Sequence, residues 1–138
     1  MGTVQKYVVW FKEVDKDDGA LVGGKGANLG EMAKAGFPVP NGFIVTSPAY
    51  FHFLKANDLN TTLKKELASL DYSNPSSLQA TSSIIKKEIT RGKIPEDIAL
   101  LIMEFYQKLN TDVISAFSDQ LVAVRSSATA EDLKTASF

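Results

Sequence analysis

The 138-residue chain contains no cysteine, and this absence removes several classes of chemistry. Without a thiol there is no disulfide, no thiolate metal site and no cysteine nucleophile, and such a composition is typical of a reducing interior. The chain also has little net charge. Its formal value of -1 provides no field that would hold a polyanion, so we expect no nucleic-acid partner.

Long hydrophobic runs are missing as well. No stretch approaches the roughly 18 consecutive apolar residues of a membrane-spanning helix, and the N-terminus lacks the pattern of a secretory signal. These absences predict a cytoplasmic protein with no membrane partner. The content of 44% hydrophobic and 22% charged residues is that of an ordinary globular protein, and the length suffices for one domain with a core.

The apolar pattern predicts a few strands and several helices. The expected strands, rich in β-branched and aromatic residues, lie at 7–11, 42–46 and 121–124. The expected helices lie at 27–35, from 47 onward, near 61–67, at 78–91 and from 95 to 109. Charged residues at 12–18 are interpreted as a solvated turn. Because strands and helices do not alternate regularly, the predicted class is α+β, with several helices on a small, mainly antiparallel sheet.

Two of these helices have a predicted buried face. In the helix that begins at Ser47, the side chains of Tyr50, Phe51 and Leu54 are expected to point inward. The helix after Pro95 has the clearest amphipathic pattern. Its expected buried residues are Ile98, Leu101, Ile102, Phe105, Tyr106 and Leu109.

A glycine-rich segment with a single lysine occupies residues 21–30, with the sequence LVGGKGANLG. It matches neither familiar phosphate loop: Gly26 stands where the Walker A loop needs a magnesium-binding hydroxyl, and the last glycine is one residue too late for the dinucleotide fingerprint. A glycine-rich turn that opens a helix can still bind an anion, with Gly24 allowing close approach and Lys25 adding charge. The alternative is a tight turn with a solvated lysine.

A second segment, AVRSSATAED, occupies residues 123–132. Arg125 follows four apolar residues, so we expect its guanidinium at the exit of a core strand, where its planar fork suits phosphate oxygens. Three hydroxyl donors follow in the same loop: Ser126, Ser127 and Thr129. The alternative is structural, with Arg125 paired to Glu131 or Asp132. Together the two segments predict a nucleoside triphosphate site on which the two cations converge.

Three motifs in this order resemble the N-terminal nucleotide-binding region of the phosphoenolpyruvate synthase (pyruvate, water dikinase) family. They are VGGKGANLGE at 22–31, VPNGF at 39–43 and VRSSATAED at 124–132, and the resemblance runs over nearly the whole chain. It implies that residues 1–138 are the first subdomain of an ATP-grasp nucleotide-binding domain, incomplete at its C-terminus. Pyruvate phosphate dikinase and rifampicin phosphotransferase share this type of domain and stay open as alternatives.

The resemblance also implies roles. Lys25 and Arg125 would contact the phosphates of ATP, in enzymes that phosphorylate a histidine and then pyruvate to give phosphoenolpyruvate, AMP and phosphate. The carboxylates that hold Mg²⁺, the second ATP-grasp subdomain, the phosphohistidine domain and the pyruvate site are expected outside this chain. His52, between two phenylalanines, is expected to be a partly buried structural side chain.

The chain stops at Phe138, shortly after the last motif, and we therefore expect a fragment. Such a fragment would have no catalytic or metal-binding residue of its own and would be inactive alone. A different class of function is also open: a non-catalytic module that binds a nucleotide or a partner.

Overall fold

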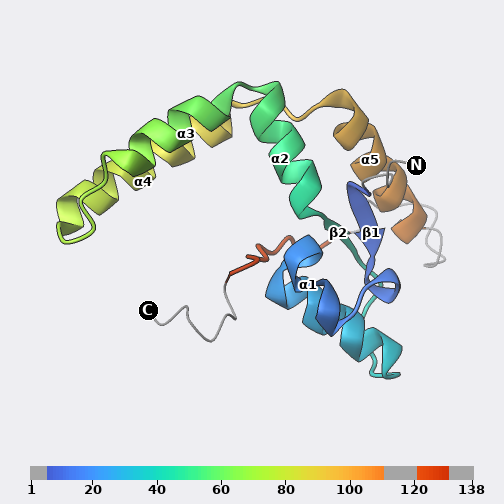
Figure 1. Ribbon diagram of the computed structural model, residues 1–138. Helices are drawn as coiled ribbons and strands as arrows, with labels where there is room; N and C mark the ends of the chain where they lie inside the picture. Colours follow the sequence, from blue (N-terminus) through green and yellow to red (C-terminus); the bar gives the residue numbers. More distant parts are fainter. Residues whose placement is uncertain (1–5, 111–120, 131–138) are drawn as a thin grey trace, which may run out of the picture. The chain divides into compact units, whose positions relative to one another are not determined.

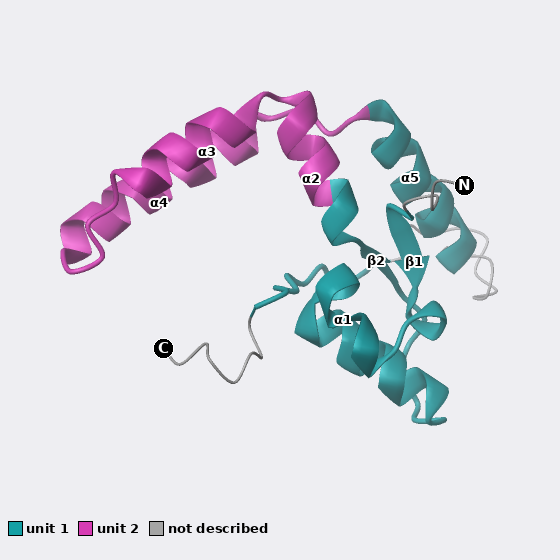
Figure 2. Cartoon of the chain, viewed as in Figure 1, with its two compact units in different colours: residues 1–49, 96–138 teal, residues 50–95 magenta. Residues whose placement is uncertain are grey.

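The structure of the chain, a computed structural model, describes residues 6–110 and 121–130 (Figure 1). The chain divides into two compact units: residues 1–49 with 96–138 form unit 1, and residues 50–95 form unit 2 (Figure 2). Within the described residues, five α-helices accompany one two-stranded antiparallel sheet. The protein is therefore α+β, as the sequence predicts.

The sheet of unit 1 consists of β1 (Val8–Trp10) and β2 (Phe43–Val45), and both strands lie where the sequence predicts them. The paired residues are Val8 with Val45, Val9 with Ile44, and Trp10 with Phe43. Beyond the end of β2, the buried Thr46 hydroxyl donates to the carbonyl of Lys6 at 2.7 Å. This hydrogen bond ties the chain after β2 to the chain before β1.

The helix α1 (Gly19–Lys34) packs against the sheet and against two short 3₁₀ helices, η1 (Phe11–Glu13) and η2 (Lys16–Asp18). The buried core of this region consists of Val9, Val14, Val22 and Ala27. Close packing needs a glycine at position 30, because a Cβ there would lie 2.8 Å from both the carbonyl carbon and Cγ2 of Val14. The two 3₁₀ helices occupy the segment that was interpreted as a solvated turn.

The predicted start of α1 is wrong, because the helix begins at Gly19 rather than at Ala27. Glycine has a low helix propensity, about 1 kcal/mol less favourable than alanine. For this reason the sequence pattern predicts a turn in the glycine-rich stretch. Burial of Val22 and Ala27 in the core offsets this preference.

An aromatic cluster joins α5 (Glu96–Asn110) to the sheet. The rings of Trp10 and Phe105 are stacked with centroids 4.6 Å apart, and Phe43 meets both of them edge-on. The predicted inner face of α5 is confirmed. Two of its residues are buried and four are partly buried: Ile98 and Leu109, then Leu101, Ile102, Phe105 and Tyr106.

Unit 2 contains most of α2 (Ser47–Ala56), together with α3 (Leu59–Ala68) and α4 (Pro75–Arg91). The helices α3 and α4 lie side by side (Figure 2). Asn74 caps α4, with its side-chain oxygen accepting from the N–H of Ser76 at 3.0 Å. Gly92 ends α4, as the sequence predicts.

The predicted orientation of two aromatic residues in α2 is wrong. Leu54 is buried, but Tyr50 is 44% and Phe51 is 62% exposed. Their rings contact each other with centroids 5.8 Å apart. Helical spacing shows which residues share a face, but it does not show whether another element covers that face.

The predicted strand at residues 121–124 is also wrong. Residues 121–130 contain no strand, and Leu121 and Val124 are 95% and 92% exposed. An apolar run forms a strand only where a neighbouring strand supplies hydrogen-bond partners, and no described strand pairs with this run. Arg125 therefore follows an exposed segment without regular secondary structure instead of a core strand.

Among the helices of the described part of the chain, none is long and apolar enough to cross a membrane.

Candidate functional site

The two motif segments contact each other in unit 1, although 101 residues separate the partners Gly26 and Ser127. The Gly26 N–H donates to Ser127 Oγ at 3.1 Å, and the Gly24 N–H donates to the carbonyl of Ala128 at 3.1 Å. Ser127 Oγ in turn donates to the carbonyl of Val22 at 2.8 Å. The structure thus brings together the two segments that the sequence analysis singled out.

A kink at Gly23 makes this contact feasible. Its φ of 74° and ψ of 168° interrupt α1, in a region of backbone space that is essentially restricted to glycine. A Cβ at this position would also lie 2.7 Å from the carbonyl carbon and oxygen of Ser127. The second half of α1 therefore begins at Gly24, and the predicted turn before a helix is a kink within one.

Some backbone N–H groups at the start of the second half of α1 already have hydrogen-bond acceptors within the protein. Both Gly24 and Gly26 donate to protein acceptors from residues 127 and 128. An anion that used these two groups would have to replace those acceptors. The binding of an anion by this helix N-terminus therefore stays a prediction.

An open hollow of about 740 Å³ lies beside the contact between the segments. Its lining residues are Lys16, Asp17, Gly19, Ala20, Gly24, Ala27, Asn28, Thr129 and Ala130. Of the predicted site residues, Gly24 and Thr129 line it. Lys25 is half-buried beside Gly24 in the chain, while Arg125 and Ser126 are exposed on the opposing segment.

The comparisons with known proteins identify the family. Residues 19–138 match the family model described as pyruvate phosphate dikinase, AMP/ATP-binding domain. The chain belongs to this family. The resemblance found in the sequence is therefore confirmed.

Curated relatives of this AMP/ATP-binding domain are phosphoenolpyruvate synthases. A probable phosphoenolpyruvate synthase of Methanothermobacter thermautotrophicus is 47% identical over 133 residues, which cover 96% of this chain and 19% of that protein. One of Methanocaldococcus jannaschii is 44% identical over 137 residues, which cover 99% of this chain and 11% of that protein. The phosphoenolpyruvate synthase of Aeropyrum pernix is 42% identical over 135 residues, covering 97% and 16%. The chain thus spans between 11% and 19% of the length of these relatives.

The sequence analysis missed three polar residues that line the hollow of the AMP/ATP-binding domain: Lys16, Asp17 and Asn28. Lys16 belongs to η2, in the segment interpreted as a solvated turn, and Asn28 lies in the second half of α1. The position of Asn28 one helical turn after Gly24 would have indicated that both residues share a face. No local signal would have found Lys16, because the fold of the chain between β1 and α1 determines its position.

Carboxylates hold the two short helices η1 and η2 in place. Asp15 Oδ2 accepts from Lys34 Nζ at 2.8 Å, and this hydrogen bond, followed by one from the Asp17 N–H, lowers the pKa of Asp15. The same pairing raises the pKa of Lys34. The pKa of Glu13 is also lowered, mainly by the hydrogen bond from the Trp10 N–H at 2.8 Å. The Asp15–Lys34 pair therefore ties the start of η2, which carries Lys16, to α1.

Other predicted features of the site have different outcomes. Glu131 and Asp132, the alternative partners of Arg125, lie outside the described residues. His52 is half-buried, as expected. Within residues 6–110 and 121–130, no three histidine, aspartate or glutamate side chains form a group that could hold a metal ion.

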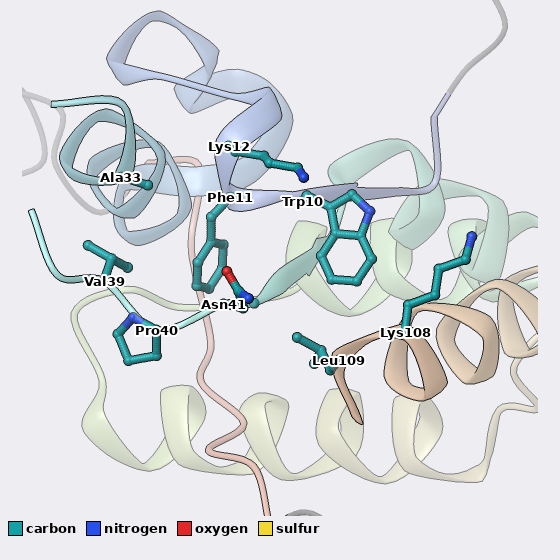
Figure 3. Close-up of a pocket in the computed structure, with 10 residues that line it drawn as sticks. Trp10, Phe11, Lys12, Ala33, Val39, Pro40, Asn41, Lys108 and Leu109 are labelled. Atoms are coloured by element: carbon teal, nitrogen blue, oxygen red, sulfur yellow. The ribbon is translucent and has the colours of Figure 1, made fainter. Parts of the chain in front are cut away.

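Residues of the VPNGF motif line a second cavity, of about 310 Å³ (Figure 3). Val39, Pro40, Asn41 and Gly42 line it together with aromatic rings and two lysines. The Phe11 N–H donates to the carbonyl of Gly42 at 3.0 Å, and a Cβ on Gly42 would collide with the Phe11 ring. This motif therefore packs the loop before β2 against Phe11, and its cavity shares no lining residue with the hollow.

Proposed function

We propose that the chain is the ATP-binding part of a phosphoenolpyruvate synthase-like dikinase. The observation that carries the proposal is the contact of the glycine-lysine and arginine-hydroxyl segments beside an open hollow. Membership of the AMP/ATP-binding family and the printed names of the relatives support it. In this proposal, residues 1–138 are the first subdomain of an ATP-grasp domain.

Lys25 and Arg125 neutralise and align the triphosphate. Phosphoryl transfer needs little covalent chemistry from the protein, so positioning and charge stabilisation account for most of the catalysis. Gly24 and Thr129 form part of the wall against which the phosphates lie. Ser126, which is exposed on the same loop as Thr129, supplies a further hydroxyl donor.

The complete reaction converts ATP, pyruvate and water to AMP, phosphoenolpyruvate and phosphate through a phosphohistidine. We assign that histidine, the pyruvate site and the ligands of Mg²⁺ to the part of the relatives that this chain does not span. The isolated chain then binds nucleotide weakly and turns over no substrate.

Calorimetric titration of ATP into the 138-residue chain tests the binding site. Each of Lys25→Ala and Arg125→Ala should weaken binding about 10- to 150-fold, because a charged hydrogen bond contributes about 1.5–3 kcal/mol. Lys64→Ala and Arg91→Ala are matched controls, since both cations are exposed in unit 2. Equal effects of the site variants and the controls would refute the assignment.

The same two substitutions test the reaction in a chimera. There this chain replaces the matching 133 residues of the Methanothermobacter relative. We expect the chimera to form phosphoenolpyruvate from ATP and pyruvate, and either substitution to abolish this activity. A chimera that phosphorylates an antibiotic and ignores pyruvate, or variants that keep full activity, would contradict the proposal.

A further inference from the structure

The kink in α1 breaks a helical hydrogen bond, and a side chain from the second motif fills the gap. In an uninterrupted α-helix, the Gly26 N–H would donate to the carbonyl of Val22, four residues earlier. Here the hydroxyl of Ser127 lies between them. It accepts from Gly26 at 3.1 Å and donates to Val22 at 2.8 Å.

This hydroxyl also acts as the cap of the second half of α1. The first N–H groups of a helix have no helical partner and usually take one from a side chain at the preceding residue. Gly23 occupies that place and has no side chain to offer. Ser127 and the carbonyl of Ala128 satisfy Gly26 and Gly24 instead.

We propose that Ser127 is a positioning residue, whose hydroxyl holds the kink of α1 so that Gly24 and Thr129 are aligned at the hollow and Lys25, the neighbour of Gly24, is held in place. Lys25 lies between the two residues whose amides are held, so its backbone is fixed on both sides. The same contact fixes the loop that carries Thr129 to the wall of the hollow. This inference rests on the proposed function for its ligand, and it gives Ser127 a role other than the phosphate contact expected from the sequence.

The chemistry limits which residues can fill this position. The bridging group must donate one hydrogen bond and accept another at the same atom, and a hydroxyl does both. Alanine does neither and leaves the Gly26 N–H and the Val22 carbonyl without this partner. Threonine keeps the hydroxyl.

Amide exchange in the chain without nucleotide tests the bridge directly. Ser127→Ala should accelerate exchange of the Gly26 amide about fivefold, which corresponds to a cap of about 1 kcal/mol, and Ser127→Thr should restore protection. Ser126→Ala is the matched control for this measurement, because that neighbouring hydroxyl is exposed. Unchanged exchange in Ser127→Ala, or equal acceleration in the control, would overturn the proposal.

The unmodified chain provides a second measurement that does not depend on how a variant folds. Scalar coupling across a hydrogen bond between the Gly26 nitrogen and the Val22 carbonyl should be absent, because the hydroxyl separates them. Its detection would show a direct helical hydrogen bond and would also overturn the proposal.

Nucleotide titration then distinguishes a positioning role of Ser127 at the nucleotide site from a general loss of local stability. Ser127→Ala should weaken ATP binding more than AMP binding, because the proposed function assigns Lys25 to the triphosphate, and Ser127→Thr should restore the ratio. Ser83→Ala, whose hydroxyl bonds within α4, should change neither affinity. Equal weakening of ATP and AMP, or loss of ATP binding with unchanged Gly26 exchange, would refute the positioning role. If the unmodified chain binds no ATP, the proposed function fails while Gly26 exchange still tests the bridge.

Discussion

Replacing Gly23 by alanine should destabilise unit 1 far more than an ordinary glycine substitution. The backbone at Gly23 has a φ of 74° and a ψ of 168°, where an alanine costs about 1–3 kcal/mol. The added Cβ would also lie 2.7 Å from backbone atoms of Ser127, so rotation of the serine side chain alone does not relieve the collision. The loop must move away.

That movement removes the two hydrogen bonds from Gly24 and Gly26, each of which contributes about 1 kcal/mol. The total expected loss is therefore about 3–5 kcal/mol. Gly36→Ala is the matched control: Gly36 has a similar φ of 81°, but a Cβ there meets nothing within 4 Å. It should cost only about 1–2 kcal/mol for the left-handed conformation.

Urea unfolding followed by Trp10 fluorescence measures both variants. Trp10 is the single tryptophan of the chain and stacks on Phe105 in unit 1, so its emission reports the unit that contains both glycines. Linear extrapolation gives the free energy of unfolding of each variant. If the two variants agree within about 0.5 kcal/mol, the contact with Ser127 contributes nothing and the reasoning fails.

Two further predictions concern other parts of the chain. The pKa of Asp15 is lowered from 3.8, mainly by Lys34, so its stabilising effect exists above about pH 4 and disappears as pH falls through the folded-state pKa. Asp15→Asn should therefore lower the urea midpoint at pH 7, and by progressively less as the pH falls below about 4; a loss that does not shrink with falling pH would contradict this. In unit 2, Asn57 makes two hydrogen bonds with the Lys93 backbone, of 2.8 and 2.9 Å. Asn57→Ala should cost about 1–3 kcal/mol in unfolding followed by circular dichroism, and an equal loss in the exposed Asn60→Ala would count against it.

Local patterns were sufficient for much of the secondary structure. Runs of β-branched and aromatic residues predicted β1 and β2. Gly92 marked the end of α4, Pro95 marked the start of α5, and helical spacing identified the inner face of α5. Each of these signals depends on neighbours within a few residues. The motifs also identified the family from the sequence alone, because their residue types and order are specific.

The errors arose where distant residues determine the outcome. Residues 121–124 have the composition of a strand, yet pairing requires a second strand that no local pattern provides. The rings of Tyr50 and Phe51 follow an apolar pattern, but covering them requires another element. The start of α1 depends on core packing, which offset the low helix propensity of its glycines.

The candidate site divides in the same way. Composition and motif order selected Lys25, Arg125 and the hydroxyls as the chemistry-bearing residues, because charge and hydrogen-bonding capacity belong to the side chain itself. Only the folded chain brings the Ser127 hydroxyl into the broken turn of α1 and adds Lys16 to the hollow. The bridge spans 101 residues, and a contact through space at that separation follows from packing, which no local sequence pattern encodes.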